Sequence, residues 1–107
     1  MKVILIDAED REFGTTGPKV REVEVANELE PIQKLVGGYI EAHRLTNGDL
    51  LLLNEDFFTI TRKVSLLWAF NYGRWGGQGV IVGVRGSEWT SPKTSVKAVE
   101  KGVQWAS

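Results

Sequence analysis

The sequence predicts a single α+β domain with a largely antiparallel sheet and two or three helices packed on one face. Three observations predict this class. Asn47-Gly48 separates two strand-like runs, a strong hairpin signal because both positions of a tight turn favour positive φ. Residues 80–85 form an apolar, β-branched run that indicates a buried strand. Apolar side chains recur at helical spacing in residues 29–36 and 96–103.

The N-terminal half is predicted to contain two strands and then a helix. Residues 3–6 are continuously apolar, which suits a central strand covered on both faces. A polar loop follows over residues 8–18, and residues 19–25 alternate like a strand with one wet face. Asn27 is expected to cap a helix that runs to residue 36, because its side-chain oxygen can accept a hydrogen bond from a free amide of the first turn.

Two consecutive glycines, Gly37 and Gly38, are predicted to end this helix and to start a strand at Tyr39. Either glycine can adopt the left-handed conformation that stops a helix without a clash of a Cβ atom. A phosphate-binding loop is the alternative reading. Such loops run from strand to helix, whereas this one runs from helix to strand. We therefore expect these three residues, like Asn47 and Gly48, to have a structural role.

The second half is predicted to hold strands at residues 50–54 and 80–85 and a final helix that starts at Ser91-Pro92. Residues 57–61 have strand propensity. Residues 63–72 are interpreted as a helix with a broad apolar pattern that Gly73 ends. The glycine-rich residues 73–79 are interpreted as a flexible loop.

The composition offers few groups for chemistry. The 107 residues suit one domain, residues 1–107, and they contain no cysteine and a single histidine. That set cannot supply the ligands of a zinc site, and His43 alone does not indicate a catalytic triad. The carboxylates of residues 7–12 are interpreted as a solvated loop in preference to a magnesium site. We expect no catalytic residue, no metal and no cofactor, and hence no enzyme.

Charge is divided unevenly along the chain. Residues 1–56 carry twelve acidic and six basic side chains, whereas residues 57–107 carry two acidic and seven basic ones, which gives −6 and +5. All four tryptophans lie in the basic half. Trp75 sits in a polar, glycine-rich segment and Trp89 follows Gly86-Ser87-Glu88, so both are candidates either for exposure or for covering the edge of the core. The predicted interaction residues are Tyr72, Arg74, Trp75, Arg85 and Trp89.

The segment Leu-Val-Gly-Gly-Tyr-Ile-Glu at residues 35–41 resembles the signature of a domain-of-unknown-function family. Its members are small accessory proteins of phages, plasmids and other mobile elements. Asn54-Glu55 after the hairpin and the apolar residues 79–83 fit the family in the same order, and the aromatic residues 57–75 depart from it. The resemblance implies a phage or mobile-element accessory protein in a bacterial host, and it implies no catalytic residues.

Two functions are therefore weighed. The first is a protein-interaction module that binds and modulates a host or phage protein. The alternative is nucleic-acid binding, in which the basic, tryptophan-rich C-terminal half contacts phosphates and stacks on bases. Self-association is a further expectation, and a symmetric homodimer is favoured over head-to-tail contacts. The apolar residues 2–7 are too short for a membrane span or a signal peptide, so we expect a cytoplasmic protein without membrane contact.

Overall fold

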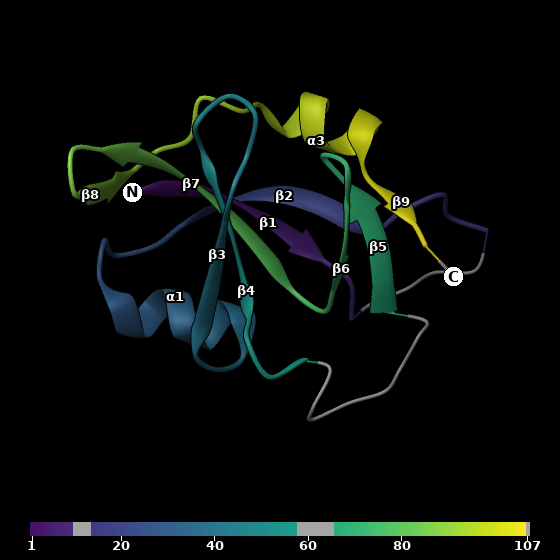
Figure 1. Ribbon diagram of the computed structural model, residues 1–107, viewed down its shortest axis with the longest axis horizontal. Coiled ribbons are helices and arrows are strands. Elements are labelled where there is room, and N and C mark those ends of the chain that lie inside the picture. The colour runs from purple at the N-terminus through teal and green to yellow at the C-terminus, as the bar shows by residue number, and fades with distance from the viewer. Residues whose placement is uncertain (10–13, 58–65, 107) are drawn as a thin grey trace.

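The computed structural model describes residues 1–9, 14–57 and 66–106. It shows a six-stranded sheet, a three-stranded sheet and two helices, and all of the strand pairs are antiparallel (Figure 1). The prediction of an α+β domain with a largely antiparallel sheet is thus confirmed.

The large sheet has the order β2-β1-β7-β4-β3, and β8 pairs with the far end of β7. Its strands are β1 (Lys2–Asp7), β2 (Lys19–Glu24), β3 (Ile40–Arg44), β4 (Leu50–Asn54), β7 (Gly79–Arg85) and β8 (Glu88–Thr90). The three central strands are the apolar ones, as their near-continuous hydrophobic sequences predict. The edge strands β2 and β3 carry the charged side chains.

The two helices lie on opposite faces of this sheet. They are α1 (Leu29–Val36) and α3 (Val96–Gly102). Leu5 of β1 packs in one cluster with Ile32 of α1, and its neighbour Ile4 packs in another cluster with Val99 of α3. The prediction that the helices pack on one face is therefore wrong. Central strands that are apolar on both faces require a cover on each face, because successive side chains of a strand point to opposite sides.

The small sheet replaces a predicted helix and a predicted loop. It has the order β6-β5-β9 and consists of β5 (Leu67–Phe70), β6 (Gly73–Gly76) and β9 (Gln104–Trp105). The helix predicted over residues 63–72 is wrong where the structure describes it, and so is the flexible loop predicted from residue 73. Pairing of β5 with strands on both sides outweighs the local helical pattern. Residues 58–61 of the predicted strand lie outside the described residues.

Trp68 attaches the small sheet to the large one. It lies directly opposite Trp75 in β6 and opposite Trp105 in β9, so three indole rings share one face. Trp68 is fully buried, and its Nε1 donates a hydrogen bond of 2.9 Å to the carbonyl of Gly77. The ring covers Gly79 at the start of β7, where an added Cβ atom would lie 2.9 Å from it. Only glycine allows this approach.

The sequence predicted the C-terminal end of α1 correctly but not its N-terminal cap. Glu28 occupies the N-cap position without a side-chain hydrogen bond, so the predicted cap at Asn27 is wrong. The Asn27 side chain instead donates 2.8 Å to the carbonyl of Trp89, which ties this loop to β8. At the other end, Gly37 has φ of 85° and its amide donates to the carbonyl of Gln33. This left-handed residue ends the helix.

The β3–β4 hairpin lies where Asn47-Gly48 predicts it, but the conformation of its turn differs from the predicted one. The amide of Leu45 donates to the carbonyl of Asp49, and the amide of Gly48 donates back to the carbonyl of Leu45. Gly48 has φ of 93°, whereas Asn47 has no positive φ. The loop thus comprises residues 46–48, a tight turn followed by a left-handed glycine, instead of two residues that both need positive φ.

We expect Gly37→Ala to destabilise the fold by about 1–2 kcal/mol, because a side chain at its left-handed φ meets its own backbone. Gly38→Ala is the matched control. Its φ is not in the left-handed region, and the atoms nearest to an added Cβ belong to the Asn54 side chain, which can rotate away. Urea denaturation of both variants measures the difference. Equal losses at the two positions would contradict the assignment of the helix stop to Gly37.

Candidate functional site

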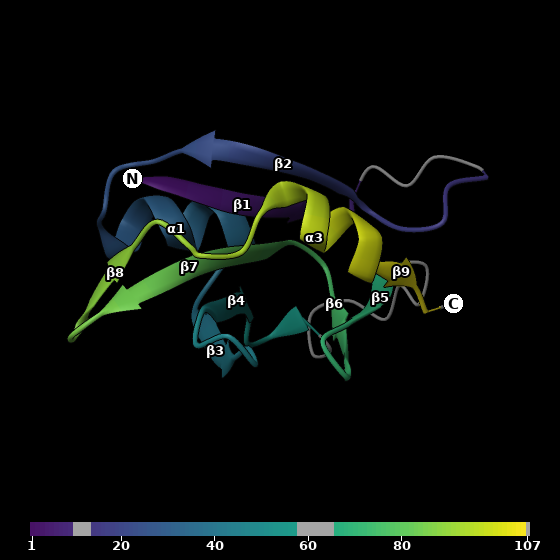
Figure 2. The ribbon, with the colours of Figure 1, turned by 90° about the horizontal axis from the view of Figure 1, so that it is seen from above.

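The predicted interaction residues do not form one surface. Tyr72, Arg74 and Trp75 belong to the β5–β6 hairpin, whereas Arg85 and Trp89 belong to the β7–β8 hairpin. Figures 1 and 2 show these hairpins on opposite sides of the molecule. The two groups are close in sequence but not in space, because the seven-residue strand β7 lies between the two hairpins.

The two tryptophans that were candidates for exposure are both half-buried. Trp75 packs against the cluster that contains Trp68, and its Nε1 donates 2.9 Å to the carbonyl of Phe70. Trp89 packs against the cluster that contains Ile32. Of the two readings offered by the sequence, the arrangement favours covering of the core at both positions.

Tyr72 is the exposed aromatic residue of the set. Its side chain is 100 % exposed, and it occupies the two-residue turn that joins Phe70 to Gly73. Asn71 has φ of 50° and Tyr72 has φ of 64°. Two positive φ values in a two-residue loop define a type I′ turn, for which Asn-Gly is the preferred sequence. A bulky residue in the second position is strained.

The strained turn is held from three sides. The Thr46 hydroxyl donates 3.3 Å to the Asn71 side-chain oxygen, which links the turn to the β3–β4 loop. The Phe70 ring lies over Gly102 at the end of α3, where an added Cβ atom would come within 3.1 Å of it. The Trp75 indole bonds the Phe70 carbonyl. Asn71 was not singled out from the sequence, because a left-handed asparagine gives no pattern of its own.

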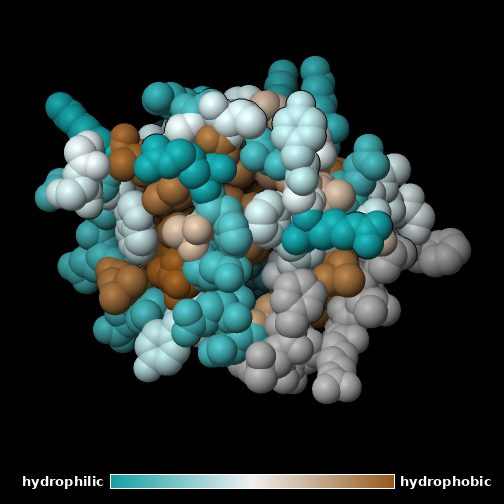
Figure 3. Space-filling view, viewed as in Figure 1, coloured by the Kyte–Doolittle hydropathy of each residue, from teal (hydrophilic) through white to brown (hydrophobic). Residues whose placement is uncertain are grey.

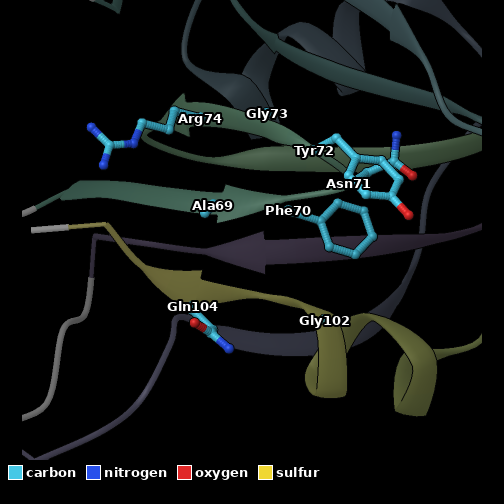
Figure 4. A pocket seen from close by; sticks show the side chains of 8 residues that line it. All are labelled: Ala69, Phe70, Asn71, Tyr72, Gly73, Arg74, Gly102 and Gln104. Atoms are coloured by element: carbon cyan, nitrogen blue, oxygen red, sulfur yellow. The ribbon is translucent and has the colours of Figure 1, made fainter.

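A shallow groove lies beside this turn on the outer face of the small sheet. Arg74 and Gln104 are the cross-strand neighbours of Ala69, so the small Ala69 forms a floor between two longer polar side chains. The groove has a volume of about 410 Å³ and continues past Phe70 and Tyr72 to Gly102 (Figure 4). Among the eight residues that line it, only Arg74 is charged.

Asp49 is a buried polar residue that the sequence reading missed. The residue is 1 % exposed. Its carboxylate accepts hydrogen bonds from the amides of Lys93 and Thr94 at 3.2 and 2.9 Å. The Thr94 hydroxyl adds a third bond at 2.6 Å. Asn47 also bonds Thr94, at 2.8 Å. This network fastens the β3–β4 loop to the segment that leads into α3, which is a structural task.

The remaining candidates for chemistry are dispersed. His43 packs on the ring of Trp75 with centroids 4.5 Å apart, and its Nε2 lies 3.0 Å from a carboxylate oxygen of Glu41. Nε2 is buried and forms no hydrogen bond with any described residue. Of the acidic residues 7–12, Asp7 lies 3.9 Å from Arg21, and residues 10–12 are outside the described part. The described residues contain no group of three side chains suited to a metal ion.

Comparison of the chain with models of protein families, with curated proteins and with solved structures finds no match. The resemblance of residues 35–41 to the phage and plasmid family therefore stays a prediction. Within the described residues, no helix has the length and apolar character to cross a membrane.

We expect Asp49→Ala to destabilise the protein by about 2 kcal/mol, because it leaves two partly buried backbone amides without an acceptor. Asp49→Asn keeps one acceptor oxygen and should lose less. Thermal and urea unfolding of the two variants measure the difference. If Asp49→Ala unfolds like the wild type, the carboxylate does not anchor the β3–β4 loop.

Proposed function

We propose that this chain is a non-enzymatic protein-interaction module that contacts an acidic protein surface through the β5–β6 hairpin. The observation that carries the proposal is the fully exposed Tyr72 in a left-handed turn position. Backbone strain at a site held rigidly by its surroundings is a recognised pointer to function.

The Tyr72 side chain is fully exposed, so it does not contribute to the packing of the fold. The left-handed conformation costs about 1–2 kcal/mol for a residue with a Cβ atom, and glycine avoids this cost. Within the described part of the chain, the Tyr72 hydroxyl makes no hydrogen bond. A large aromatic ring that is presented to solvent on a rigid turn is instead suited to insertion into a partner, since little conformational entropy is lost on binding.

The groove beside Tyr72 favours an acidic partner. Arg74 is exposed and, among the described residues, forms no ion pair with a carboxylate of this chain. The guanidinium is therefore available to a carboxylate of another protein, which it can bind through two parallel hydrogen bonds. Tyrosine and arginine are also the residue types that most often dominate binding energy at protein interfaces.

Nucleic-acid binding is the second candidate, and the arrangement of the aromatic residues favours it less. Trp68, Trp75 and Trp105 each donate their indole N–H within the chain and pack with the core. Stacking on bases needs exposed rings, and among the described residues of this half the large exposed aromatic one is Tyr72. The β5–β6 and β7–β8 hairpins, which carry Arg74 and Arg85, lie on opposite sides of the molecule (Figure 1), so the two arginines do not follow one phosphate backbone.

The biological setting follows from the sequence resemblance alone. We propose that the module is an accessory protein of a phage or another mobile element and that it acts in the cytoplasm of a bacterial host. Its partner would then be a host or phage protein with an acidic surface. The chain's own contribution, in this proposal, is recognition and not catalysis.

Tyr72→Gly should separate stability from function. It creates the Asn-Gly sequence that a type I′ turn prefers and removes the strain, so the free energy of unfolding should stay unchanged or rise by up to about 1 kcal/mol. Binding to the partner should be lost. Urea denaturation measures the first effect. A clear loss of stability would show that the Tyr72 side chain serves the fold and would overturn the proposal.

The contact surface can be located by photo-crosslinking in the bacterial host. A photoreactive phenylalanine analogue replaces Tyr72, and in a control it replaces Tyr39, which is 68 % exposed in the turn before β3. We expect a discrete crosslink to a protein other than this chain from position 72 and none of that kind from position 39. Arg74→Glu should abolish the crosslink, whereas Arg85→Glu, the same change on the other side, should leave it.

Three results would contradict the protein-interaction proposal. The first is an absence of any crosslink specific to position 72, and the second is equal sensitivity to Arg74→Glu and Arg85→Glu. The third is binding of single- or double-stranded oligonucleotides that weakens steeply as salt rises, because such a salt dependence is characteristic of phosphate contacts. That outcome would favour the nucleic-acid function.

A further inference from the structure

We propose that two copies of this chain associate through the outer edge of β3, as an antiparallel strand pair whose twofold axis passes beside Ala42. The proposal concerns a different surface from the β5–β6 hairpin and does not depend on it. It rests on the direction of backbone groups in β3, on the order of charges along that strand, and on a contrast with β2.

β3 is an edge strand of the large sheet, and the backbone amides and carbonyls on its outer side have no neighbouring strand among the described residues to pair with. The amide of Leu45 and the carbonyl of Tyr39 bond residues at the two ends of β4. In an antiparallel ladder the bonded positions alternate, so the odd-numbered residues of this strand face β4. The even-numbered residues Ile40, Ala42 and Arg44 therefore direct their amides and carbonyls outward.

A twofold axis fixes how a second β3 can pair with this edge. The axis stands perpendicular to the sheet, so side chains of one face meet side chains of the same face. With the axis at Ala42, each Ala42 lies opposite the other, and Ile40 lies opposite Arg44 of the second copy. All of the outward amides and carbonyls of the strand then find partners in a regular ladder.

This register is also the one that the side chains favour. Glu41 of each copy lies opposite His43 of the other, at the closely spaced positions of the ladder, where a carboxylate can accept a hydrogen bond from an imidazole N–H. A shift of the axis by one residue would place Glu41 opposite itself or His43 opposite itself. The five residues of β3 therefore specify both the partner and the alignment.

The buried Nε2 atom of His43 supports the same register. Its Nε2 is buried and has no hydrogen bond, although the Glu41 carboxylate of the same chain lies 3.0 Å away. Buried polar atoms in folded proteins nearly always have a partner. Pairing of two β3 edges brings a second Glu41 carboxylate to the same face, beside the imidazole, and so supplies a further acceptor.

The opposite edge of the large sheet shows that this complementarity is not general. In β2 the outward groups belong to even-numbered residues, because Val25 and Met1 exchange both of their backbone bonds. An axis at Glu22 places it opposite itself, and an axis at Arg21 does the same for the arginine. An axis at Val20 sets Lys19 against Arg21. The β2 edge thus repels a second copy, a common protection of edge strands.

The β3 edge is accessible to a second copy. Glu41, Ala42 and Arg44 are exposed, and the small Ala42 at the axis lets the two backbones approach. Figure 3 views the molecule from the side on which β3 lies and shows apolar surface between hydrophilic side chains there. A five-residue pairing of this kind is a small interface, so we expect a weak dimer that forms at high protein concentration.

Sedimentation of the full chain over micromolar to millimolar concentrations tests the proposal. The wild type should shift from monomer to dimer. Ala42→Pro should weaken the dimer by about tenfold or more, because it removes an outward amide from each copy. It breaks no bond to β4, so the monomer should stay folded. The matched control is Glu22→Pro, which removes an outward amide of β2 and should leave the association unchanged.

A charge exchange gives a test that does not involve proline. Glu41→Lys should weaken the dimer, and Glu41→Lys combined with His43→Glu should restore it, because lysine and glutamate then lie opposite each other. A wild type that stays monomeric at millimolar concentration would overturn the proposal. Equal effects of Ala42→Pro and Glu22→Pro, or no recovery in the double variant, would also overturn it. The photo-crosslink from position 72 should persist in the Ala42→Pro variant, because the β5–β6 hairpin is a different surface. Loss of the dimer and loss of that crosslink can therefore be told apart.

Discussion

The seating of Trp68 on Gly79 is the contact on which the second half of this structure depends. One indole ring fills the space between the two sheets, bonds the carbonyl of Gly77 and lies in line with a tryptophan from each neighbouring strand. The absence of a Cβ atom at Gly79 brings the ring close to the start of β7. Because β7 is the central strand of the large sheet, this contact fixes the small sheet against the middle of the core.

A firmly attached small sheet allows its hairpin to hold an unfavourable turn. Strained residues persist only where the surrounding structure determines their conformation. Here Phe70 packs on Gly102, and Asn71 accepts a bond from Thr46, so the turn is fixed from both the α3 side and the β3–β4 side. The buried carboxylate of Asp49 joins those two sides to each other. The exposed ring of Tyr72 is thus mounted on a well-supported base.

The two edges of the large sheet solve the edge-strand problem differently. β2 carries charges whose order opposes pairing with a copy of itself in the registers that a twofold axis permits. β3 places the Glu41 carboxylate opposite the His43 imidazole of a second copy when the axis lies at Ala42. The difference arises from the position of single charges relative to the strand's alternation and not from the total charge, which is small for the whole chain.

The sequence by itself determined the features that depend on neighbours along the chain. The αL glycine at the end of α1, the β3–β4 hairpin and the apolar strands β1, β4 and β7 follow from local backbone preference and from hydrophobic runs. Only the tertiary structure decided what depends on distant partners. Residues 67–76 form a hairpin because β9 pairs with β5 and the start of β7 packs against Trp68, and a helix would lose both contacts. It also separated Tyr72 from Arg85 and buried Asp49, since neither distance nor burial is encoded in spacing along the chain.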